Sequence, residues 1–196
     1  MTDEELMRAA LDEAKIAADL GEVPVGAVVA KDGEIVARAH NLRESGKNAT
    51  YHAELMAIDA ACKTLGGWRL WQCELFVTLE PCPMCSGAII NSRLKRVVYG
   101  ARDPKAGCCG SLTNLFALPF NHHPVIESGL LEDEAVQDIL DRNYGLTLDY
   151  AKAGSLDMVT ADHEGRNFLF PSSQTALEYY QQLYGAPGKS QIVFNT

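Results

Sequence analysis

The stretch LFVTLEPCPMCSGAIINSRLKRVVYG, residues 75–100, decides how this chain folds. Its first five residues are apolar or β-branched and predict a strand. Pro83 suits the first turn of a helix, which we expect to run to about Ser92. Residues 96–100 predict a second strand. A helix between two strands at this spacing indicates the α/β class, in which helices cover a central sheet.

The sequence before this stretch predicts a helix, a hairpin and another helix. Residues 3–20 carry apolar side chains at helical spacing. Residues 25–37 predict two strands joined by a tight turn at Asp32-Gly33. Thr50 is expected to cap a helix that runs to about Leu65.

The sequence after this stretch indicates one domain followed by an appendage. Residues 101–122 are rich in Gly and Asn and predict a loop with a short helix, and residues 131–144 predict a longer helix. We therefore expect a domain of residues 1–149 and an appendage of residues 150–196. Within the appendage the pattern predicts a helix at about 173–184 and a short strand at 191–194.

Composition is that of an ordinary globular protein, with 47% hydrophobic and 22% charged residues in a chain of 196. No apolar run is long enough to span a membrane. The N-terminus is acidic, whereas a signal peptide begins with basic residues. We therefore expect a cytoplasmic protein with no membrane partner, and six cysteines that are not a disulfide scaffold.

The net charge of −9 counts against nucleic acid as a partner, because phosphate binding depends on Lys and Arg. Charge is uneven, however, and residues 91–110 hold five basic residues against one acid. A basic patch of this kind can meet a phosphate backbone, or it can be a solvated loop and helix end. Both interpretations stay open on charge alone. The basic residues are Arg93, Lys95, Arg96, Arg102 and Lys105.

Two short motifs carry the chemistry: His52-Ala53-Glu54 and Pro81-Cys82-Pro83-Met84-Cys85. Cys82 and Cys85 are three positions apart at a predicted helix N-terminus, so both sulfurs project from one face where the helix favours thiolates. Two thiolates and the His52 imidazole make a tetrahedral zinc site with one open position. Zinc lowers the pKa of a water there to about 7, and Glu54 can reach that water.

Other interpretations of these motifs are a redox-active Cys pair, two buried thiols, a chance His-x-Glu, or a structural zinc with a fourth ligand. The combination of motif, spacing and placement favours the catalytic site. The cysteines that could supply a fourth ligand are Cys62, Cys73, Cys108 and Cys109.

The pattern H-x-E…P-C-x-x-C is the signature of zinc nucleobase deaminases, and this chain most closely resembles the TadA-type tRNA adenosine deaminases. The resemblance implies a cytidine-deaminase-like α/β/α sandwich with a central mixed sheet, assembled as a homodimer. It implies conversion of adenosine to inosine at the wobble position of a tRNA anticodon, with the anticodon stem-loop as partner. The resembling residues are 22–28, Asn41, 50–57, 78–88, 93–112 and Asn121-His122.

The resemblance also assigns roles to residues. His52, Cys82 and Cys85 would hold one zinc ion per chain. Glu54 would move protons between the water, the ring and the departing ammonia. The other substrate contacts would be Asn41 on the flipped base and, around the nucleotide, Val25, Ala53, Asp103 and Asn121.

The C-terminus departs from the family, whose members usually end in a basic, aromatic-bearing helix. Here residues 141–149 keep Tyr144 but lack the run of Arg and Lys. An alternative function is therefore a deaminase of a free nucleobase or nucleoside, of the guanine, cytosine or adenosine type. A third hypothesis is a zinc-stabilised interaction module, which would have no use for Glu54.

Overall fold

The protein is described by a computed structural model, which covers residues 1–144, 148–149, 158–161 and 167–170. The chain divides into two compact units, Met1–Ala135 and Val136–Thr196. The domain limits expected from the sequence, 1–149 and 150–196, stay a prediction. No helix in the described residues is long and apolar enough to cross a membrane.

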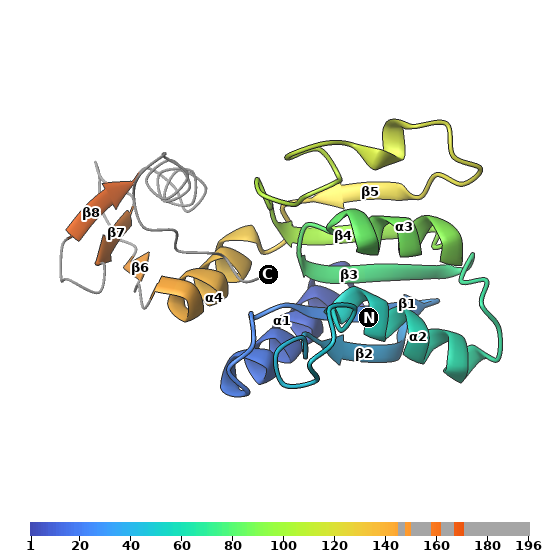
Figure 1. Cartoon of the computed structure of the whole chain (residues 1–196), viewed down its shortest axis with the longest axis horizontal. Helices are drawn as coiled ribbons and strands as arrows, with labels where there is room; N and C mark the ends of the chain where they lie inside the picture. Colours follow the sequence, from blue (N-terminus) through green and yellow to red (C-terminus); the bar gives the residue numbers. More distant parts are fainter. Residues whose placement is uncertain (145–147, 150–157, 162–166, 171–196) are drawn as a thin grey trace. The chain divides into compact units, whose positions relative to one another are not determined.

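A five-stranded mixed sheet forms the centre of the first unit, in the order β2-β1-β3-β4-β5 (Figure 1). The hairpin pair and the β1–β3 pair are antiparallel, whereas β3–β4 and β4–β5 are parallel. The predicted turn is confirmed, because Asp32 and Gly33 both have positive φ, as a two-residue hairpin turn requires. The strands are β1 (Gly26–Lys31), β2 (Glu34–His40), β3 (Cys73–Leu79), β4 (Arg96–Ala101) and β5 (Val125–Ser128).

Helices cover both faces of this sheet, which confirms the α/β/α sandwich. Alternate residues of β1 point to opposite faces. Val28 and Ala30 pack with α1, whereas Ala27 and Val29 pack in the cluster that includes α2 and α3. Figure 1 shows α2 and α3 on the same side of the sheet. The helices are α1 (Asp3–Asp19), α2 (Ala53–Leu65), α3 (Pro83–Ser92), a short 3₁₀ turn η1 (Leu115–Ala117) and α4 (Glu132–Tyr144).

Gly26 allows α1 to lie close against β1. A Cβ at this position would stand 2.0 Å from the Ala10 carbonyl oxygen and 2.4 Å from the Ala14 nitrogen. Both are backbone atoms and cannot move aside, so only glycine fits. The glycine next to Val25 therefore has a packing role rather than a chemical one.

The predicted cap of α2 is wrong. The helix begins at Ala53, and its N-cap residue is His52, which makes no side-chain capping bond. Thr50 instead donates hydrogen bonds from its backbone N–H and its hydroxyl to the side chain of Asn48. The Asn48 side chain thus forms a local turn with Thr50, and this turn competes with capping of the helix by the Thr50 hydroxyl.

Four strands were not predicted. β5 is one of them, and the other three form a small antiparallel sheet in the second unit, in the order β6-β7-β8. The helix and strand predicted at 173–184 and 191–194 lie outside the described residues. The three strands are β6 (Leu148–Asp149), β7 (Met158–Ala161) and β8 (Asn167–Phe170).

Arg96 joins three elements to β4. Its guanidinium lies 2.6 Å from Asp3 of α1, 2.6 Å from Glu127 of β5 and 3.1 Å from Glu74 of β3. Only 17% of its side chain is exposed. Arg96 therefore stabilises the fold, and its positive charge does not contribute to a basic surface because three carboxylates surround it.

Replacing Arg96 by Met is expected to lower the free energy of unfolding at pH 7 by about 1–3 kcal/mol, because three carboxylates lose their cation. Hydrogen bonds from Arg96 hold the pKa of Asp3 and the pKa of Glu127 below their ordinary values. Their contribution is therefore complete above the unfolded-state pKa values of about 4 and disappears as the pH falls through the lower folded-state values. Thermal unfolding should show a larger difference between the two chains at pH 7 than at pH 3, and the difference should continue to fall at lower pH. A difference independent of pH would contradict this account.

Candidate active site

Three potential metal ligands meet at one edge of the sheet. His52 is the N-cap residue of α2, Cys82 is the N-cap residue of α3, and Cys85 lies in the first turn of α3. β3 delivers the chain to this edge, since only Glu80 and Pro81 separate its last residue from Cys82. Two helices that begin at the same edge thus bring together residues that are about thirty positions apart.

The spacing of the three ligand atoms fits a zinc ion. The Nδ1 atom of His52 lies 3.7 Å from the Sγ atom of Cys82 and 3.6 Å from the Sγ atom of Cys85. Tetrahedral bonds of about 2.3 Å to sulfur and 2.0–2.1 Å to nitrogen place such atoms about 3.6 Å apart. Among the described residues the cluster consists of these three side chains alone, so none of the other four cysteines supplies a fourth ligand. The donor set is that of an open, catalytic site.

The surroundings favour negative charge on Cys82. Hydrogen bonds from Cys85 and His52 lower the pKa of the Cys82 thiol to about 4, although burial opposes the change. The Cys82 carbonyl also accepts the first backbone bond of α3, from the Ser86 N–H. A thiolate at a helix N-terminus is the form that binds a metal.

Glu54 is buried beside these ligands. It lies in the first turn of α2 and is 4% exposed. Burial, assisted by the negative charge at Cys82, raises the pKa of Glu54 to about 7. A carboxyl group with a pKa near neutrality can both accept and return a proton.

Backbone hydrogen bonds bring the proposed base-binding residues next to His52. The Asn41 N–H donates to the Val25 carbonyl at 2.9 Å, and the Leu42 N–H donates to the Tyr51 carbonyl at 3.0 Å. Ala53, which follows His52, is fully buried. The backbone therefore links the segment of Val25 and Asn41 to Tyr51, the residue before His52.

Asp103 and Asn121 occupy different places. Asp103 lies in the loop after β4, where burial raises its pKa and the negative charges at Glu80 and Cys82 add to the effect. Its carboxylate accepts hydrogen bonds from the backbone N–H groups of Lys105 and Ala106. Asn121 instead accepts a hydrogen bond from Arg93, the C-cap residue of α3. The whole length of α3 separates Arg93 from Cys82, so the structure does not bring Asn121 to the ligand cluster within one chain.

Two buried carboxylates that hold nearby loops were not predicted from the sequence. Glu80 is 2% exposed and accepts hydrogen bonds from the backbone N–H groups of Asp103, Cys109 and Ser111 and from the Ser111 hydroxyl. Gly107 permits this arrangement, because a Cβ there would stand 2.4 Å from the Glu80 carboxyl carbon. Glu80 thus fixes the loop that carries Asp103 and Lys105.

Glu22 is the second missed carboxylate and is 1% exposed. It accepts hydrogen bonds from the Asn41 side chain and from the backbone of Glu44 and Ser45. In the sequence, each of these two glutamates is marked only by lying directly beside an apolar segment. Glu22 precedes the apolar run that begins at Val23, and Glu80 stands between Leu79 and Pro81.

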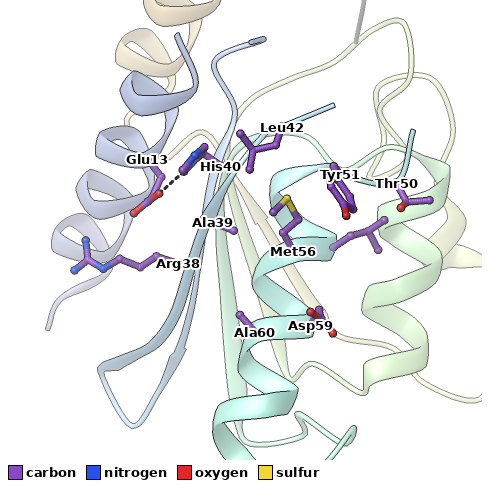
Figure 2. A pocket seen from close by; sticks show the side chains of 11 residues that line it. Glu13, Arg38, Ala39, His40, Leu42, Thr50, Tyr51, Met56, Asp59 and Ala60 are labelled. Carbon is purple, nitrogen blue, oxygen red and sulfur yellow. Dashed lines mark hydrogen bonds and ion pairs between the residues drawn. The ribbon is translucent and has the colours of Figure 1, made fainter. Parts of the chain in front are cut away.

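A cavity of 520 Å³ lies next to the loop that leads to His52, between β2, α2 and α1. Figure 2 shows the hydrogen-bonded pair of His40 and Glu13 on one side and Met56 and Tyr51 on the other. The residues that line it include Leu42 and Tyr51, whose backbones are joined, but none of the three ligands. The cavity therefore adjoins the candidate site without containing it.

Comparison with known proteins agrees with this geometry. The family model of MafB19-like deaminases matches residues 1–135. A tRNA-specific adenosine deaminase of Bacillus subtilis is 56% identical over 136 residues, which cover 68% of this chain and 84% of the relative. A solved structure from studies of A-to-I editing by tRNA:A34 deaminases at the wobble position of transfer RNA has a TM-score of 0.67. It is 43% identical, and the match covers 68% of this chain and 98% of that one.

A guanine deaminase structure from Nitrosomonas europaea has a TM-score of 0.58 at 22% identity, covering 72% of this chain and 84% of that one, and so shares the fold. The fold and the three-ligand cluster define a nucleobase-deaminase type of protein. The chain belongs to the deaminase family that the model describes, within the group of tRNA-specific adenosine deaminases.

Proposed function

We propose that this protein hydrolyses adenosine to inosine and ammonia at the wobble position of a tRNA anticodon, with one zinc ion per chain. One observation carries the proposal: the His52, Cys82 and Cys85 cluster with the buried Glu54 beside it, in a chain 56% identical to a tRNA-specific adenosine deaminase. The acid beside the ligands also distinguishes this site from a purely structural zinc.

Each residue of the site has a defined task. His52, Cys82 and Cys85 would hold the zinc, which supplies a Lewis acid for the activation of water. Glu54 accepts a proton from the attacking water and delivers it to ring N1, while the water oxygen bonds to C6. Glu54 then carries the second proton from that oxygen to the amino nitrogen, so that the C6–N bond breaks and ammonia leaves. The product has a C6 carbonyl and a protonated N1, which is inosine.

Ammonia release tests this function. The zinc-loaded protein is expected to release ammonia from an anticodon stem-loop RNA with adenosine at the wobble position. A stem-loop with guanosine there should release none, and free adenosine, adenine, guanine and cytosine should react far more slowly. Faster release from a free base or nucleoside would instead establish the alternative, which the net charge of −9 favours.

The five basic residues of the stretch 91–110 lie in different places. Arg93 ends α3, Lys95 directly precedes β4, and Arg96 begins β4 and binds three acids. Arg102 and Lys105 are exposed on the loop that Glu80 fixes. We propose that these two side chains supply phosphate contacts near the site.

Replacing Arg102 and Lys105 together by Ala should flatten the slope of log affinity against log salt by about one to two units, because each phosphate contact contributes about 0.7–0.9. Binding of the stem-loop at several salt concentrations measures the slope. Lys95→Ala is the control, since it removes one positive charge of the same stretch outside this loop. An equal change per charge in the control would show that net charge, rather than position, decides binding.

The resemblance to tRNA adenosine deaminases supports further proposals. We expect a homodimer, which sedimentation of the purified protein would show directly. We also expect a cytoplasmic location, where an anticodon stem-loop is available, and a deaminase domain that extends to residue 149.

A further inference from the structure

Glu22 connects the end of α1 to the loop that carries Asn41. Its own N–H donates to the Ala17 carbonyl at 2.9 Å, which anchors it at the end of the helix. Its carboxylate accepts hydrogen bonds from the Ser45 N–H at 2.6 Å, the Glu44 N–H at 3.1 Å and the Asn41 Nδ2 group at 3.3 Å. One backbone bond therefore ties Glu22 to the helix, and three bonds tie its buried carboxylate to the loop.

The carboxylate of Glu22 stays ionised in this place. Burial alone would raise the pKa of Glu22, but the hydrogen bonds from Ser45 and Glu44 and the nearby charge of Arg43 outweigh it, so the pKa lies below its ordinary value. An ionised carboxylate accepts hydrogen bonds and donates none. Its neighbour must therefore present a donor.

This requirement determines the orientation of the Asn41 side-chain amide. The two ends of an Asn amide have nearly the same shape, and either could face a neighbour that both donates and accepts. Only the NH₂ end of the Asn41 amide can face a carboxylate, because this end donates hydrogen bonds and a carboxylate only accepts them. The Oδ1 atom and the second N–H of Asn41 are then presented in a fixed order on the other side of the amide.

We infer that Glu22 is a positioning residue that fixes the amide orientation of Asn41 and so sets the order of donor and acceptor offered to the base. The inference rests on the proposed function, which places Asn41 against the flipped adenine. An Asn amide pairs with an adenine edge through one donor and one acceptor, and the reversed amide would offer them to the wrong atoms. Glu22 would thus contribute to base selection without touching the base.

Glu22→Gln tests the inference, because a glutamine of the same shape both donates and accepts and permits both orientations of Asn41. With the stem-loop RNA we expect KM to rise about tenfold and kcat to change much less. Thermal unfolding and zinc content of the variant verify that the fold and the ligand cluster persist. A fall in kcat alone, with KM unchanged, would overturn the inference.

A double-mutant cycle separates positioning from a general effect on the loop. In an Asn41→Ala background, Glu22→Gln should change kcat/KM less than about twofold, because there is no amide left to orient. An equal loss in both backgrounds would mean that Glu22 acts only by holding residues 44–45, and would overturn the inference.

NMR of the Asn41 side-chain amide tests the contact with Glu22 without any measurement of turnover, so this test is independent of the proposed function. In the unsubstituted protein, NMR should show one Asn41 side-chain amide proton shifted downfield and slow to exchange with water. Two equally fast protons would overturn the inference even in a chain that deaminates the stem-loop. A protected proton in a chain that releases no ammonia would support the contact while refuting the proposed function.

Discussion

Replacing Glu54 by Gln should reduce turnover of the stem-loop RNA by about 10²–10⁴-fold, because glutamine keeps the shape of the side chain but carries no proton between water, ring and leaving group. Zinc content and thermal stability should stay near those of the unsubstituted protein, since Glu54 is not among the three clustered ligands. Single-turnover ammonia release measures the effect on the chemical step.

Glu13→Gln is the matched control for Glu54→Gln. Glu13 is also a largely buried glutamate, with 13% of its side chain exposed, and it bonds to His40 rather than to the ligand cluster. Its substitution should leave turnover nearly unchanged. Near-normal turnover in Glu54→Gln would show that another group moves the protons.

Replacing Cys82 by Ser should remove zinc and activity together. The hydroxyl is a poor ligand for zinc at neutral pH, and the remaining His52 and Cys85 leave an incomplete donor set. We expect less than about one tenth of a zinc ion per chain, against about one in the unsubstituted protein, measured by elemental analysis after purification.

Cys62→Ser provides the comparison for Cys82→Ser. Cys62 lies near the end of α2, away from the N-terminus that carries His52, and is also a free thiol. It should keep both zinc and turnover. A Cys82→Ser protein that remained active with no bound metal would remove the basis of the proposed mechanism.

Local patterns were sufficient to predict the central hairpin and strand and the helix that carries Cys82 and Cys85. The Asp32-Gly33 turn, the apolar run of β3 and the Pro83 start of α3 each act over a few residues, and the structure contains all three. β5 was missed because three of its four residues are exposed, so no alternation of buried and exposed side chains marks it. An edge strand of this length is recognisable only from its pairing with β4.

Features that depend on distant partners could not be predicted. Glu22 meets Asn41 across 19 positions, and Arg96 meets Asp3 across 93. In the sequence, the first is an acid near a helix end and the second is one of five basic residues. Burial of a charge becomes visible only when the fold shows which loop or helix end is brought against it.

The site divides into two parts that are held by different means. The ligands and Glu54 sit on helix N-termini fixed by the central sheet, whereas Glu22 and Glu80 fasten the loops that carry Asn41 and Asp103. Evolution can therefore rebuild the loops, in length or sequence, without disturbing the reactive centre. This separation identifies the two loops as the places where length and sequence can vary while the helix N-termini that carry His52, Cys82 and Cys85 stay unchanged.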